Sequence, residues 1–182
     1  MRVLVIVDMQ NDFTTGSLGN KECKAVIPKI VDIINNEEFN EYILTRDTHY
    51  EDYLDTFEGK KLPVKHCIED TYGWEICEPI MKALNDKNKY HVTTVIDKTT
   101  FGSLYMANLL KEKYFIDQKD VEFTVVGVCT GICVISNALL LKAALPESKI
   151  TVKANACACV TPESHKTALD AMRMCHINIE ED

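Results

Sequence analysis

The fold is decided by the stretch Thr124-Val-Val-Gly-Val-Cys-Thr-Gly-Ile-Cys133-Val-Ile-Ser-Asn-Ala-Leu-Leu-Leu141. Its β-branched residues are interrupted by Gly127 and are followed by an apolar segment of helical length. This order is typical of a buried parallel strand that turns sharply into a helix. We therefore predict a strand from Glu122, a tight turn, and a helix that ends near Leu145.

Cys133 lies in the predicted turn, at the start of the helix. Unpaired backbone amides and the positive end of a helix dipole both favour a thiolate over a thiol, so the position suits a nucleophile. Free cysteine is also among the residue types most often buried for packing alone. The stretch by itself leaves both roles open for Cys133, and partners elsewhere in the chain must decide between them.

The rest of the chain alternates buried strands with amphipathic helices. Thr161 and Pro162 have the types preferred at the N-cap and the first position of a helix, and Pro79 either kinks its helix or marks its start. The predicted strands cover residues 2–7, 41–45, 90–97 and 150–154, with a further edge strand at 177–179. The predicted helices cover residues 24–36, 74–86, 103–114 and 162–175.

This alternation predicts an α/β fold, a single domain over residues 1–182 with a doubly wound parallel sheet. The arrangement is Rossmann-like, with three α/β/α layers, and no linker or repeat indicates a second domain. Residues 47–72 have little periodicity. Irregular segments of that length in a compact domain are commonly functional.

Composition excludes several classes of partner. With 46% hydrophobic and 26% charged residues the chain is a globular protein, and its net charge of -8 argues against nucleic acid or an anionic membrane. We expect a small-molecule substrate and, because no signal peptide or membrane-spanning run is recognised, a cytoplasmic location. Eight cysteines in such a chain are expected to be reduced. Cys157 and Cys159 are expected to be packing residues rather than a redox pair.

Three chemically active residues stand at the carboxyl ends of predicted strands: Asp8, Lys98 and Cys133. Ligands of open α/β sheets bind at this edge. A lysine that stabilises a thiolate, beside a carboxylate that accepts and returns protons, forms a nucleophilic set. Each residue alone also has an ordinary explanation, with Asp8 as the cap of a turn and Lys98 as a solvated surface residue.

Six segments, in this order along the chain, resemble the isochorismatase-like superfamily of cysteine hydrolases, and within it most closely the nicotinamidases (pyrazinamidases). Each segment alone is weak, whereas six in order are strong, and they span nearly the whole chain. The segments are Val5-Ile-Val-Asp8-Met-Gln-Asn-Asp-Phe13, Thr45-Arg-Asp-Thr-His49, Pro63-Val-Lys-His-Cys67, Asp97-Lys-Thr-Thr-Phe-Gly-Ser103, Gly127-Val-Cys-Thr-Gly-Ile-Cys-Val134, and Ala156 with Thr161-Pro-Glu-Ser-His165.

The resemblance implies roles for individual residues. Asp8, Lys98 and Cys133 match the catalytic triad of the family. A cis peptide bond is implied between Val128 and Cys129, so that the backbone N–H groups of Cys129 and Cys133 form an oxyanion hole. Three further positions, implied as walls of the substrate pocket, are Phe13, Leu18 and Phe101.

A metal site is also implied, with Asp47, His49, Glu58 and His66 as ligands of one divalent ion. Two imidazoles and two carboxylates suit zinc, iron or manganese. The spacing of Asp47 and His49 agrees with this role, because residues two apart in an extended chain point to the same side. Glu58 is favoured over acidic neighbours such as Asp55 only by its match to the family spacing.

The implied activity is metal-dependent hydrolysis of nicotinamide to nicotinate and ammonia through a thioester, a step of NAD biosynthesis by pyridine nucleotide salvage. Relatives commonly form homo-oligomers, so a homo-oligomer is expected. Three alternatives stay open: a cysteine amidohydrolase for carbamoyl or ureido substrates, an isochorismatase, and a binding protein without catalysis. The metal ligands argue against the first, and Cys133 argues against the second because isochorismatases do not need a nucleophilic cysteine.

Overall fold

The computed structural model describes residues 1–87 and 92–181. Six parallel strands form one sheet in the order β3-β2-β1-β4-β5-β6. The strands are β1 (Arg2–Val7), β2 (Glu41–Asp47), β3 (Val92–Lys98), β4 (Glu122–Val128), β5 (Lys149–Ala158) and β6 (Asn178–Glu180). The strand order reverses direction between β1 and β4, and this point in a doubly wound sheet is where ligands bind.

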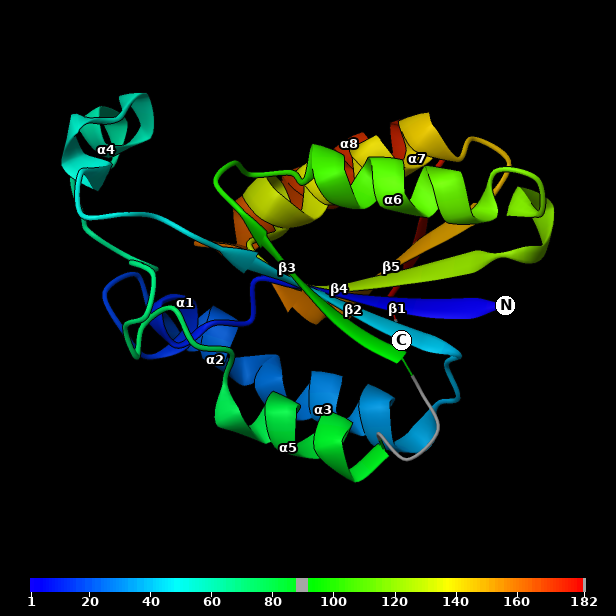
Figure 1. The fold of residues 1–182 in the computed structure, drawn as a ribbon, viewed down its shortest axis with the longest axis horizontal. Coiled ribbons are helices and arrows are strands. Elements are labelled where there is room, and N and C mark those ends of the chain that lie inside the picture. Colours follow the sequence, from blue (N-terminus) through cyan, green and yellow to red (C-terminus); the bar gives the residue numbers. More distant parts are fainter. Residues whose placement is uncertain (88–91, 182) are drawn as a thin grey trace.

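Two layers of helices cover the sheet, as Figure 1 shows, which confirms the predicted α/β/α arrangement. One layer contains α6 (Leu104–Tyr114), α7 (Ile135–Ala144) and α8 (Pro162–Met174). The other contains α1 (Asn11–Thr14), α2 (Lys21–Ala25), α3 (Ile27–Asn36) and α5 (Glu78–Lys87). No helix in the described residues is long and apolar enough to cross a membrane.

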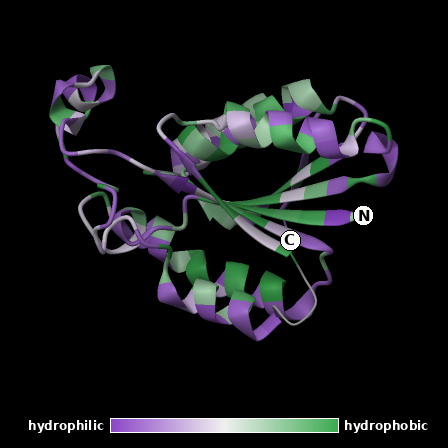
Figure 2. Ribbon diagram, viewed as in Figure 1, coloured by the Kyte–Doolittle hydropathy of each residue, from purple (hydrophilic) through white to green (hydrophobic). Residues whose placement is uncertain are grey.

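The central strands are apolar on both faces because each face packs under a helix layer. Along β1, Val3, Val5 and Val7 pack in the core under α6 and α7, whereas Leu4 and Ile6 pack in the core under α3 and α5. This is the two-residue alternation of a strand. In Figure 2 the strands between the helix layers are coloured hydrophobic over most of their length.

Several predicted boundaries are wrong, for identifiable reasons. The predicted helix 24–36 is two helices, because Pro28 has no N–H to donate and a new helix begins beside it at Ile27. The predicted helix from Trp74 begins only at Glu78, so Pro79 marks its start. Ile76 lies instead in an extended segment that bridges to Gln10.

Two strands are longer than predicted. β2 continues to Asp47 because Arg46 and Asp47 pair with Asp97 and Lys98 of β3. β5 continues through small residues to Ala158, where it pairs with Val128 of β4. Polar or small residues hide a strand from periodicity, and in both cases pairing with a neighbour decides the structure.

Other predictions agree with the structure. The Thr161 side chain accepts from the N–H of Ser164 in a capping box, with Pro162 in the first turn of α8. The predicted edge strand corresponds to β6, and Ser103 caps α6. The predicted start of β3 at Tyr90 lies outside the described residues.

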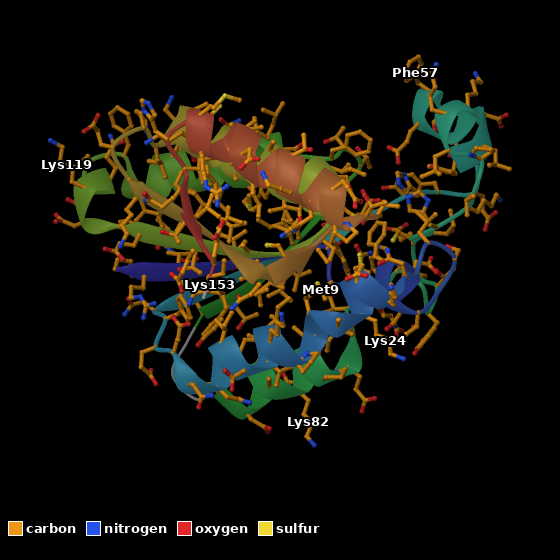
Figure 3. All side chains as sticks on the ribbon, turned by 180° about the vertical axis from the view of Figure 1, so that it is seen from behind. Met9, Lys24, Phe57, Lys82, Lys119 and Lys153 are labelled. Atoms are coloured by element: carbon orange, nitrogen blue, oxygen red, sulfur yellow. The ribbon has the colours of Figure 1, made fainter. Side chains whose placement is uncertain are left out.

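The segment predicted to be irregular contains a 3-10 turn, η1 (Tyr53–Asp55), and a short helix, α4 (Phe57–Lys61). Figure 1 shows α4 on a lobe that extends beyond the two helix layers. Phe57 points outward from this lobe in Figure 3 and is 81% exposed. The lobe (residues 50–65) follows β2 directly, so both of its ends lie near the carboxyl edge of the sheet.

Candidate active site and metal centre

Asp8, Lys98 and Cys133 meet at the carboxyl edge of the sheet. Asp8 follows β1, Lys98 is the last residue of β3, and Cys133 lies in a π-helical turn, η3 (Thr130–Val134), that joins β4 to α7. Lys98 Nζ lies 2.7 Å from Asp8 Oδ2 and 3.7 Å from Cys133 Sγ. All three residues are buried, so their charges interact without much screening by water.

The backbone of Asp8 has a φ of 48°, in the left-handed region that few residues other than glycine, asparagine and aspartate adopt. Its N–H donates to the Thr45 carbonyl oxygen at 3.1 Å, and Thr45 Oγ1 donates to Asp8 Oδ1 at 2.7 Å. One carboxylate oxygen therefore accepts from Thr45 and the other pairs with Lys98. This arrangement fixes the carboxylate at the end of β1.

Burial and their mutual charges shift the pKa values of the three triad residues. Burial raises the pKa of the Cys133 thiol well above its ordinary value, Asp8 raises it further, and Lys98 opposes both. Burial also raises the pKa of Asp8 against the opposing charge of Lys98. For Lys98, burial lowers the pKa, but Asp8, Cys133 and Asp47 outweigh this and raise it. Burial thus opposes the thiolate that a helix start favours, and a base beside the thiol would assist the loss of its proton.

The four predicted metal ligands also come together. Asp47 is the last residue of β2, His49 follows it, Glu58 lies in α4, and His66 follows the lobe. His49 Nε2 lies 3.0 Å from Asp47 Oδ2 and 3.5 Å from Glu58 Oε1, and His66 Nε2 lies 3.5 Å and 3.8 Å from the same two oxygens. One ligand atom from each residue lies within 4.8 Å of all the others. Asp55 does not belong to this group.

The donors fit a divalent transition metal. His66 Nδ1 lies 2.8 Å from the carbonyl oxygen of Val64. Because a carbonyl oxygen only accepts, Nδ1 carries the proton and Nε2 has its lone pair free for an ion. His49 Nε2 is buried and has no hydrogen-bond partner among the described residues. A buried nitrogen that faces two carboxylates without a hydrogen bond is consistent with a metal ligand.

Asp47 joins the metal ligands to the triad. Its Oδ2 faces the two histidines, and its Oδ1 lies 3.2 Å from Lys98 Nζ. Burial acts to raise the pKa of Asp47, but the contacts with His49 and His66 and the charge of Lys98 lower it strongly. These contacts favour the carboxylate form of Asp47, which lies between the metal ligands and the triad.

Residues of the triad and of the metal-ligand group line one cavity of 470 Å³. Asp47, Glu58, His66 and Cys133 line it, as do the predicted pocket residues Phe13, Leu18 and Phe101. Leu62 also lines the cavity and is 38% exposed. Lining residues that sequence reasoning missed are Ser17, Gly19, Asn20, Ile132 and Val160, of which Ile132 and Val160 are 37% and 62% exposed. No sequence signal identifies them, because single apolar residues in loops are common on protein surfaces.

Two positioning residues were also missed. The buried side chain of Gln10 donates to the Asp47 carbonyl and accepts from the Asp47 N–H, at 2.8 and 2.7 Å. Asn137, in α7, donates to the carbonyl oxygens of Cys133 and Phe101 and accepts from the N–H of Ser103. A signal existed for Asn137: an amide in an otherwise apolar helix must find hydrogen bonds.

The peptide bond between Val128 and Cys129 is cis, as the resemblance implied. Cys129 lines the same cavity as Cys133 and lies directly before the π-helical turn. A hydrogen bond of 2.8 Å between Thr130 Oγ1 and Nδ1 of His165, in α8, joins the turn to that helix. Cys129 and Cys133 are thus both presented to the cavity by one short turn.

Comparison with protein families finds a match to the isochorismatase domain over residues 2–180. Among curated proteins, the nicotinamidase of Saccharomyces cerevisiae is 28% identical in an alignment of 178 residues, which covers 76% of this chain and 80% of the relative.

Solved structures give the same picture of the fold. A nicotinamidase/pyrazinamidase from Bacillus subtilis superposes with a TM-score of 0.79 at 24% identity, covering 99% of both chains. A pyrazinamidase from Pyrococcus horikoshii in complex with zinc has a TM-score of 0.75 at 24% identity, covering 100% of this chain and 99% of the other. The yeast nicotinamidase bound to the inhibitor nicotinaldehyde has a TM-score of 0.80 at 22% identity over both whole chains.

Proposed function

Because the chain belongs to the isochorismatase family, we propose that it is a cysteine amidohydrolase that converts nicotinamide to nicotinate and ammonia. The observation that carries the proposal is that the metal ligands and the Cys133 thiol line one cavity. The curated relative and the neighbouring structures, named as nicotinamidases and pyrazinamidases, support the substrate class. We further infer that residues 1–182 act as one domain in the cytoplasm, within NAD salvage, as a homo-oligomer.

Hydrolysis would begin with proton transfer. Asp8 removes the proton of the Cys133 thiol, and the thiolate attacks the carboxamide carbon. The backbone N–H groups of Cys129 and Cys133 donate to the oxyanion, and Asp8 returns the proton to the departing ammonia. Water then gives a proton to Asp8 and attacks the thioester, the acid is released, and Asp8 returns the proton to the departing Cys133 thiolate. Lys98 stays protonated throughout, because its own pKa is raised, and its charge favours the carboxylate form of Asp8 before each proton transfer.

The metal site has a separate part in the proposal. Asp47, His49, Glu58 and His66 would hold one zinc, iron or manganese ion, which would supply a Lewis acid for the pyridine nitrogen of the substrate. Phe13, Leu18 and Phe101 would enclose the ring on its apolar faces. The ring would thus be held by its nitrogen at one end of the cavity, with its carboxamide directed to Cys133.

Substrate choice tests the proposal directly. We expect metal-loaded protein to release ammonia from nicotinamide and pyrazinamide, and at least tenfold more slowly, in kcat/KM, from carbamoyl amino acids. The physical reason is that carbamoyl amino acids have no ring nitrogen to meet the metal site. The measurement is ammonia release across this panel. Release from a carbamoyl compound alone would show that the proposal is wrong and would favour the carbamoyl or ureido alternative.

Replacing Lys98 by alanine tests its role beside the thiol. Removal of the ammonium, which lies 3.7 Å from Cys133 Sγ, should raise the pKa of the thiol further and slow its alkylation at every pH below that pKa. The measurement is the rate of Cys133 alkylation by iodoacetamide as a function of pH, followed by peptide mass mapping. Lys119→Ala is the control, since Lys119 is exposed and remote. An unchanged profile in Lys98→Ala would remove Lys98 from the triad.

A further inference from the structure

Three thiols from separate elements meet behind the active-site turn: Cys23 of α2, Cys129 before η3, and Cys159 after β5. Cys129 and Cys159 directly follow Val128 and Ala158, which are register partners on the neighbouring strands β4 and β5, and a Cβ at Gly131 of the turn would lie 3.3 Å from Cys159 Sγ. The thiol of Cys23 lies beside that of Cys129. All three are reduced. Cys23 Sγ is already fixed by a contact of 3.2 Å with Asn20 Nδ2, at the start of α2. The proposed hydrolysis uses none of these thiol groups.

Cys159 has the surroundings of a thiolate. Its sulfur lies beside the backbone amides of Gly131 and Val160 and the hydroxyl of Ser164. It also stands two residues before Thr161, the N-cap of the 13-residue helix α8. A hydrogen bond with the Cys129 thiol and these further donors lower the pKa of Cys159 to about 5. The contacts with Cys159 and Cys23, together with burial, raise the pKa of Cys129, and the contact with Cys129 lowers the pKa of Cys23 as well.

The pair joins two cavities. Cys159 lines a cavity of 230 Å³ between α2 and α8, together with Lys29, Asn155 and His165. Cys129 lines the main cavity beside Cys133. A small polar reagent that enters the smaller cavity meets the Cys159 sulfur without passing through the substrate pocket. Cys157 also lines that cavity, but its thiol points to the Val125 carbonyl oxygen and its pKa is raised to about 12 by burial.

We propose that Cys159 is a site of reversible oxidation by hydroperoxides, and that Cys129 is its disulfide partner. The Cys159 thiolate attacks a peroxide oxygen and becomes a sulfenic acid, and the peroxide leaves as water or an alcohol after taking up a proton. The Cys129 thiol then attacks the sulfenic sulfur, forms the S–S bond and releases water. In total, two thiols lose two hydrogens and one hydroperoxide is reduced. A dithiol reductant reverses the reaction by thiol–disulfide exchange.

Disulfide formation has a consequence for hydrolysis that rests on the proposed function. The two sulfurs must approach to about 2.05 Å, closer than any thiol contact. Cys129 would therefore move toward Cys159 and away from its position in the main cavity, and its backbone N–H is one of the two proposed oxyanion donors. We expect the oxidised protein to lose at least nine-tenths of its hydrolytic activity and to recover it with dithiothreitol.

Peptide mapping of the full chain tests the site without any hydrolysis assay. After treatment with one equivalent of hydrogen peroxide, trypsin without reduction should give two linked peptides, one with Cys129 and Cys133 and one with Cys157 and Cys159. Fragmentation should assign the link to Cys129 and Cys159. The Cys157→Ser variant, changed two residues away, should form the same link, whereas Cys159→Ser should form none. A link from Cys129 to Cys23, or oxidation at exposed Cys175 alone, would overturn the proposal.

Two further measurements keep the test independent of the variants and of the proposed function. In untreated wild-type protein at pH 6, iodoacetamide should label Cys159 at least tenfold faster than Cys157, and equal rates would contradict a thiolate at Cys159. In the activity assay, Cys159→Ser should keep its rate in peroxide while wild-type protein loses it. Equal loss in both would refute the coupling to hydrolysis, whereas absence of nicotinamide hydrolysis in untreated protein would refute only the proposed function.

Discussion

Cys133→Ala should reduce nicotinamide hydrolysis by about 10⁴-fold or more, because removal of a nucleophile removes the whole covalent route. Binding should persist, since the proposed ring contacts and metal ligands are unchanged and the replaced side chain is a small one that also packs in the core. The measurement is single-turnover hydrolysis together with calorimetric titration of nicotinamide.

The matched control for this variant is Cys157→Ala. Cys157 is as buried as Cys133, at 4% and 5% exposure, but lies outside the main cavity. It should keep hydrolysis within about threefold of the wild type, because a buried cysteine that only packs acts as a small hydrophobe. Wild-type hydrolysis by Cys133→Ala would exclude the thioester and would favour the binding-protein or isochorismatase alternatives.

Removal of the metal site should have the second large effect. His49→Ala and His66→Ala should each reduce bound metal from one equivalent per chain to near zero and abolish hydrolysis, because each contributes a nitrogen ligand. Asp47→Ala should do the same. Elemental analysis of the purified variants is the measurement. Glu58→Ala should lose metal only in part, since Glu58 lies on the lobe and is 23% exposed at its side chain.

The lobe offers a matched control in Asp55, an exposed acid three residues before Glu58 that does not belong to the ligand group. Asp55→Ala should keep its metal. Chelation of the wild type should lower the thermal midpoint by roughly 8 to 16 °C, the shift for about 4 kcal/mol of binding energy in a domain of this size. Full metal content in both histidine variants would show that the proposed metal site is wrong. Loss of metal in Asp55→Ala with retention of metal in Glu58→Ala would make Asp55 the fourth ligand.

The fold was largely predictable because buried strands and helix stripes leave strong periodic patterns. β1 and β4 are apolar on both faces, and α8 begins at Pro162 because Thr161 and Pro162 have the residue types preferred at a helix start. The errors in strand length lie where pairing with a neighbouring strand decides the structure, at the polar end of β2 and at the small residues that end β5. The β-propensity of a segment does not show which strand will pair with it.

The site was predictable only as far as its reactive residues. Asp8, Lys98 and Cys133 follow from their positions at strand ends, and the metal ligands from a resemblance. The residues that position them could not be predicted. Gln10 is hydrogen-bonded to Asp47, 37 residues away in the sequence, and Asn137 to Ser103, 34 residues away. The rise in the pKa of the Cys133 thiol could not be predicted for the same reason, because burial is a property of the folded chain.

The left-handed backbone at Asp8 restricts which sequences can occupy this position. The proposed hydrolysis requires a carboxylate there, while the conformation independently favours aspartate, asparagine and glycine. Asparagine is thus the substitution that keeps the shape of the strand end and discards the chemistry, and it is one nucleotide change from aspartate in the genetic code. A gene duplicate that no longer needs hydrolysis therefore has a short mutational path to a folded, ligand-binding descendant, whereas most other replacements at this position would lose stability and activity together.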